Sequence, residues 1–181
     1  VPWAPVVMTA TLFFLYVGVE IGYSGLVFSY ATRLGLTVTV TAGYLTSLFW
    51  LCITLGRLLT IPLAARVRPR FLLIVDLIGI LVFLTLLTLW PETPEVLWIV
   101  TIGLGFSMAS FFPTLLSLAG RHLPVTGRVG SSFMVGGGLS VLAHLFLIIR
   151  VGRGLGYLKH FKLSEIWLPV LIYASALIIM L

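Results

Sequence analysis

The sequence predicts an all-α membrane protein, a bundle of six transmembrane helices. Of its 181 residues, 60% are hydrophobic and 9% are charged, and the mean hydropathy is +1.21, whereas a soluble domain carries about 25% charged residues. One soluble core of this size could not hide so much apolar surface from water. The apolar runs are too long and alternate too little for membrane β-strands, so their backbone hydrogen bonds must be made within helices.

Six apolar runs are long enough to cross the lipid bilayer, which takes about 20 helical residues. They cover residues 6–30, 38–65, 71–90, 96–119, 130–149 and 166–181. Charged and turn-forming residues mark the loops between these runs. The loops contain Arg33 with Gly35, the basic cluster Arg66, Arg68 and Arg70, the segment 91–95, and the segment 121–128.

Arginine placement predicts the orientation of the spans. Arg66, Arg68 and Arg70 form one basic loop and the segment 121–128 forms another, against Arg33 on the opposite side. Both basic loops, and the N-terminus of this chain, are therefore expected in the cytoplasm. The connection after residue 149 is also basic and would face outward. We therefore divide the chain into residues 1–140, five helices of one design, and residues 141–181, a divergent basic connection and a final helix. Incomplete crossing of the fifth span is the alternative.

The residues give no support to an enzyme, a metalloprotein or a nucleic-acid-binding protein. The net charge of +6 lies in short clusters between apolar runs and forms no basic face. Cys52 has no partner for a disulfide, and His144 has no second ligand at metal-binding spacing. Ser131 and Ser132 have no histidine nearby in the sequence to activate them. We expect no catalytic residue, no metal and no cofactor.

Two opposite charges lie inside neighbouring predicted spans. Arg57 and Asp76 each lie roughly 9 to 12 Å from the cytoplasmic end of their span, at about 1.5 Å per residue. Because an unpaired charge at that depth is costly, we predict an Arg57–Asp76 ion pair that serves gating or stability. In the alternative, Arg57 extends to the cytoplasmic surface and Asp76 takes a hydroxyl or backbone partner.

Glu20 is the intramembrane acid with the strongest functional interpretation. Tyr16, Tyr23 and Ser24 lie three or four residues away, so all share one helical face with it. Such a polar stripe must face protein or water, and we expect it to bind a polar solute and a coupling Na⁺ or H⁺. In the alternative, a protonated Glu20 bonds to a neighbouring helix for packing.

Pro113 is predicted to kink the fourth span. It follows Phe111 and Phe112 in a segment that also holds Ser107, Ser110, Thr114 and Ser117. An interrupted helix with hydroxyl groups beside the interruption is typical of transporters.

Several segments together resemble a known family. They are Phe13 to Glu20, Tyr44 to Trp50, Gly56-Arg57 with Ala64-Ala65-Arg66, Phe112 to Leu118, and Gly130 to Phe133. Over residues 8–138 the chain resembles the C-terminal six-helix half of the fucose-permease-like and sodium-dependent glucose transporter branch of the major facilitator superfamily.

The resemblance implies the second half of a secondary transporter, whose solute path lies between two halves. Glu20 matches a polar or acidic family position. Because the chain has no Asn or Gln, sugar recognition would fall to Glu20, Tyr16, Tyr23, Ser24, Ser47 and Trp50, or to the absent N-terminal half. Two departures are that Ala65 stands where the family often has an acid, and that residues 141–162 lack the proline usual in the eleventh helix.

The sequence therefore predicts a multi-pass plasma-membrane carrier, present as its C-terminal half or as a truncated isoform. It would move a small sugar-like solute such as a hexose, coupled to Na⁺ or H⁺, by alternating access. Its expected partners are the lipid bilayer and an N-terminal half or a second copy, with no nucleic acid. The alternative is a non-transporting membrane interaction or regulatory protein derived from such a carrier.

Overall fold

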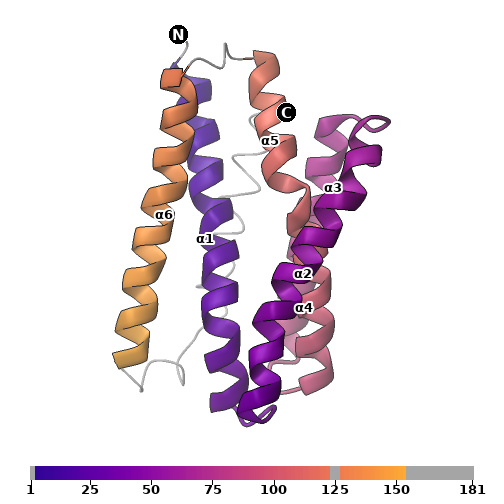
Figure 1. The fold of residues 1–181 in the computed structure, drawn as a ribbon, viewed down its shortest axis with the longest axis vertical. Helices are drawn as coiled ribbons and strands as arrows, with labels where there is room; N and C mark the ends of the chain where they lie inside the picture. Colours follow the sequence, from indigo (N-terminus) through magenta and orange to yellow (C-terminus); the bar gives the residue numbers. More distant parts are fainter. Residues whose placement is uncertain (1–2, 123–126, 154–181) are drawn as a thin grey trace. The chain divides into compact units, whose positions relative to one another are not determined.

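The computed structural model describes residues 3–122 and 127–153, and every regular element in these ranges is a helix. The helices are α1 (Trp3–Arg33), α2 (Thr39–Ala64), α3 (Pro69–Leu89), α4 (Pro94–Ala109), α5 (Phe111–His122) and α6 (Gly127–Arg153) (Figure 1). The sixth predicted span, residues 166–181, lies outside the described residues.

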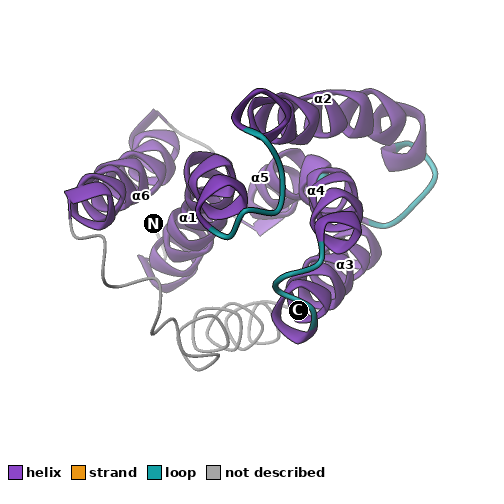
Figure 2. Cartoon of the chain, turned by 90° about the horizontal axis from the view of Figure 1, so that it is seen from below, coloured by secondary structure: helices purple, strands orange, loops and turns teal. Residues whose placement is uncertain are grey.

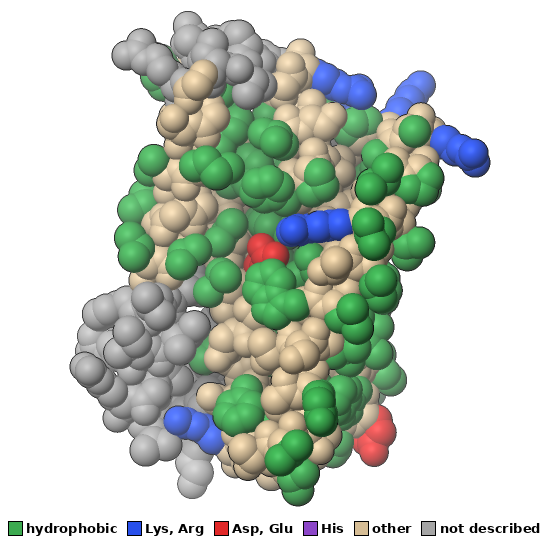
Figure 3. All heavy atoms as spheres, viewed as in Figure 1, with side chains coloured by type: hydrophobic (Ala, Val, Ile, Leu, Met, Phe, Trp, Pro, Cys, Tyr) green, Lys and Arg blue, Asp and Glu red, His purple; other side chains and the backbone are tan. Residues whose placement is uncertain are grey.

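Four helical stretches are long and apolar enough to cross a membrane. They are Trp3–Arg33, Thr39–Ala64, Pro69–Leu89 and Pro94–Arg121, and a shorter apolar stretch, Val129–Ala143, lies within α6. Exposed side chains on α2 and α3 are largely apolar, as lipid contact requires; Figure 3 shows them covering the visible flank of these helices. The all-α membrane class is confirmed.

Prolines and a glycine set the helix ends. Pro69 and Pro94 occupy the first turns of α3 and α4, where an N–H has no partner within the helix. Beyond α1, Gly35 has φ +65°, a conformation that glycine adopts without steric cost. There the Leu36 N–H donates to the Ala31 carbonyl at 3.0 Å, and the Gly35 N–H donates to the Thr32 carbonyl at 3.3 Å. These two bonds satisfy carbonyl groups that the helix end leaves open.

The fourth predicted span is two helices. We expected residues 96–119 to be one span kinked at Pro113, but α4 ends at Ala109 and α5 begins at Phe111, with Ser110 between them. Pro113 has no N–H to give the Ala109 carbonyl, and its ring clashes with that group. The interruption therefore lies one turn before the proline.

The chain forms two compact units. The first contains Val1–Gly22 and Ala119–Leu181, and the second contains Tyr23–Leu118. In the second unit α4 packs against both α2 and α3 and lies between them in Figure 2.

Glycines bring the helices of the second unit close together. A Cβ on Gly105 would lie 2.7 Å from Cys52 Cβ, and one on Gly56 would lie 2.5 Å from Ala109 Cβ, so α2 and α4 run parallel in close contact. On α3, a Cβ on Gly79 would lie 2.3 Å from Ser107 Oγ. Small residues at helix contacts are how membrane helices gain dispersion energy.

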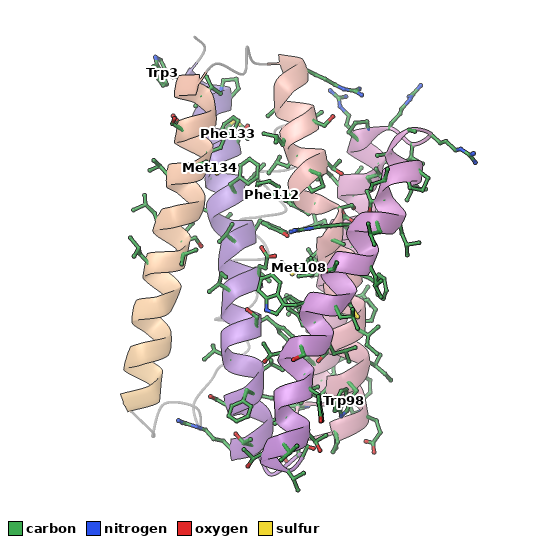
Figure 4. All side chains as sticks on the ribbon, viewed as in Figure 1. Trp3, Trp98, Met108, Phe112, Phe133 and Met134 are labelled. Atoms are coloured by element: carbon green, nitrogen blue, oxygen red, sulfur yellow. The ribbon has the colours of Figure 1, made fainter. Side chains whose placement is uncertain are left out.

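In the first unit α6 packs beside the N-terminal part of α1. The rings of Phe13 and Phe133 have centroids 5.6 Å apart, and Figure 4 shows Phe133 directed from α6 toward α1. A Cβ on Gly136 would lie 2.6 Å from the Ala10 carbonyl oxygen. Close contact between α6 and α1 at this point therefore requires glycine at position 136.

Candidate functional site

The predicted polar stripe of α1 is buried. Tyr16, Glu20 and Ser24 follow one another at intervals of four residues, and their exposed fractions are 1%, 7% and 9%. Because α1 is helical throughout this stretch, the three side chains lie on one face. A buried carboxyl group in a membrane-length helix is by default a hypothesis for a functional site.

Tyr23 connects three helices. Its hydroxyl lies 2.7 Å from Thr101 Oγ1 on α4, and its ring centroid lies 5.0 Å from that of Phe49 on α2. The Thr101 hydroxyl already donates its hydrogen to the Leu97 carbonyl at 2.7 Å. The Tyr23 hydroxyl must therefore donate to Thr101, since a threonine hydroxyl has one hydrogen.

Ser24 lies beside the start of α2. The Thr46 hydroxyl donates to the Ser24 backbone carbonyl at 3.4 Å, so α1 and α2 are joined one residue after Tyr23. Sequence reasoning identified neither Thr46 nor Thr101 as a partner, because a contact between spans leaves no periodic signal in the chain.

A second polar stripe runs along α2. Ser47, Trp50 and Arg57 are exposed and flank the buried face of α2, which is formed by Ala42, Leu45, Phe49, Cys52, Ile53 and Gly56. Thr54, which was not predicted as a site residue, lies in the same stripe by its spacing. The Trp50 side chain is 39% exposed, and its ring meets Phe49 edge-on at a centroid distance of 5.8 Å. The Ser47 hydroxyl donates to the Gly43 carbonyl at 3.5 Å.

Asp76 is buried on α3, with 6% of its side chain exposed. The Ser110 hydroxyl, at the interruption between α4 and α5, donates to Asp76 Oδ2 at 2.5 Å. A hydroxyl partner for Asp76 is the alternative expected from the sequence. The Arg57–Asp76 ion pair remains a prediction.

The three arginines of the α2–α3 turn, Arg66, Arg68 and Arg70, are exposed. Figure 3 shows Lys and Arg side chains gathered at that end of the second unit. Position 65, where an acid would stand between them and α2, is Ala65. The turn therefore presents positive charge alone.

Taken together, these helices and their buried polar groups define a multi-pass integral membrane protein. No family model matches the chain, and no solved structure matches it. It is 33% identical over 148 residues to human major facilitator superfamily domain-containing protein 4A. The matched region covers 81% of this chain and 29% of the relative. It is 36% identical over 132 residues to mouse sodium-dependent glucose transporter 1A, covering 72% of this chain and 31% of the relative.

Human sodium-dependent glucose transporter 1 is 35% identical over 164 residues, covering 90% of this chain and 30% of the relative. The chain belongs to the major facilitator superfamily, in the branch that contains these proteins. The resemblance found in the sequence is thereby confirmed. The chain spans about three tenths of the length of the curated relatives that it matches.

Proposed function

We propose that this chain is the C-terminal half, or a truncated isoform, of a secondary active carrier that moves a sugar-like polar solute with Na⁺ or H⁺. The observation that carries the proposal is the buried acid Glu20, in the middle of a membrane-length helix, in a chain whose relatives include proteins named sodium-dependent glucose transporters. Lipid surrounds the bundle, and the basic turn at Arg66, Arg68 and Arg70 faces the cytoplasm of a plasma-membrane protein.

Each polar residue has a distinct task in this proposal. The Glu20 carboxylate accepts hydrogen bonds from solute hydroxyl groups, and a bound cation neutralises its charge where the dielectric constant is low. Tyr16 and Ser24 extend that face by one turn on either side. On α2, Trp50 offers a flat apolar surface for the C–H face of a sugar ring, and Ser47 offers a hydroxyl beside it.

Transport by alternating access needs a second half. Six helices provide one wall of a path that lies between two repeats. The partner is therefore the N-terminal half of the carrier or a second copy of this chain.

Uptake into vesicles tests the proposal. The chain is reconstituted with and without a separately expressed N-terminal half, and labelled glucose and fucose are supplied under a Na⁺ or H⁺ gradient. We expect gradient-driven uptake that needs both halves and falls at least tenfold in Glu20→Gln. Glu92→Gln, the same chemical change at an exposed residue of the α3–α4 turn, is the matched control and should transport like the wild type. Absence of uptake by folded protein in every combination would refute the proposal and favour the non-transporting interaction protein.

A further inference from the structure

We infer that Asp76, together with Ser110 and Ser107, forms a Na⁺ site at the interruption between α4 and α5. The inference rests on the proposed function for the identity of the ion, and it assigns ion binding to residues other than Glu20. A carboxylate that is 6% exposed in a membrane-length helix is unstable as an anion when a neutral hydroxyl is its hydrogen-bond partner. Its charge must be neutralised by a bound proton or by a cation beside it, and a carboxylate has room for about four contacts.

The register of α3 and α4 brings further oxygen atoms to the same place. The two helices are antiparallel: Asp76 meets Ser110, and one turn along α3 Gly79 meets Ser107. Ser107 Oγ lies 2.3 Å from where a Cβ of residue 79 would be. The Ser110 hydroxyl therefore contacts the carboxylate, the Ser107 hydroxyl contacts α3 one turn away, and a side chain at position 79 would displace the Ser107 hydroxyl.

The helix interruption adds a backbone group. Pro113 cannot donate to the carbonyl of Ala109, the last residue of α4, which leaves this carbonyl without its usual helical donor. Carbonyl groups at the C-terminal ends of interrupted helices bind Na⁺ in transporters because the helix dipole is negative there.

The donor set selects the type of ion. One carboxylate, two hydroxyls and a carbonyl are oxygen ligands with a single negative charge, which suits a hard monovalent cation; Ca²⁺ sites generally use more carboxylate ligands. A proton needs one carboxylate oxygen and gains nothing from the convergence of the serines. Na⁺ therefore fits the arrangement better than H⁺.

Thermal unfolding of the purified chain in lipid nanodiscs tests the site without solute or transport. NaCl is varied against KCl and choline chloride at constant ionic strength. We expect Na⁺ at about ten times its Kd to raise Tm by roughly 3–6 °C. The rise in Tm should disappear in Asp76→Asn. In Ser110→Ala, the Na⁺ concentration that gives half of the maximal rise should be several-fold higher than in the wild type. Glu92→Gln should keep the full rise.

The outcomes separate this inference from the proposed function. Absence of a Na⁺-specific rise in the wild type, or an undiminished rise in Asp76→Asn, overturns the site even if Na⁺ drives uptake. Loss of the rise in Glu20→Gln with retention in Asp76→Asn overturns it in favour of Glu20. A rise that depends on Asp76 supports the site even if vesicles show no uptake. If Asp76→Asn does not fold, Ser110→Ala and Ser107→Ala decide the question, since an unchanged Na⁺ dependence in both refutes the site.

Discussion

Replacing Gly105 by alanine should loosen the contact between α2 and α4. The new Cβ would lie 2.7 Å from Cys52 Cβ and 2.9 Å from the Phe49 backbone oxygen, against about 3.5 to 4.0 Å for favourable carbon contacts. Neither neighbour is the end of a flexible side chain, so the helices must separate by roughly 1 Å. Such overpacking lowers the free energy of unfolding by about 1–3 kcal/mol. The higher helix propensity of alanine offsets about 1 kcal/mol of that loss.

The net expectation for Gly105→Ala is a loss of up to about 2 kcal/mol of unfolding free energy, or up to roughly 8 °C in Tm. The assay is thermal unfolding of the purified chain in nanodiscs. Gly43→Ala is the matched control, because a Cβ on Gly43 meets nothing within 4 Å, and it should stabilise by up to about 1 kcal/mol. Equal stability of the two variants would refute the reasoning from close packing.

Three further tests examine other features of the structure. Tyr23→Phe and Thr101→Val should each lower unfolding free energy by about 0.5–1.5 kcal/mol, and the double variant should lose less than the sum; additive losses would contradict the bond between them. Gly35→Ala places a side chain at φ +65° and should cost about 1–2 kcal/mol, measured by chemical denaturation, with no loss arguing against the described turn. Pro113→Ala restores a donor for the Ala109 carbonyl; we expect a higher Tm and slower uptake, and unchanged values of both would show that the proline does not maintain the interruption.

The extents of the second and third helices could be predicted closely from the sequence. Residues 38–65 and 71–90 were expected, and Thr39–Ala64 and Pro69–Leu89 are observed. The local signals at these ends are strong, since an arginine cluster and Pro69 separate two continuous apolar runs. The interruption at Ser110 was placed one turn late, because a proline acts on the carbonyl four residues before it.

The partners of the candidate residues could not be predicted in the same way. Tyr23 and Thr101 are 78 residues apart in the sequence, and neither carries a charge that would force it to seek the other. Asp76 shows the difference: its charge and depth predicted that it must have a partner, but the choice of Ser110 depends on the register between α3 and α4. That register is set by glycine contacts, which are visible only in three dimensions.

The glycine contacts of α4 also limit how the second unit can move. Gly105 and Gly56 fit α4 to α2, while Gly79 fits it to α3, so α4 is held on two sides. Sliding α4 by one turn would place larger side chains on these glycine positions, and packed interfaces resist such intermediate arrangements. The helices α2, α3 and α4 should therefore move as one block during any conformational cycle. The change in backbone angles would then fall on the turns and on Ser110.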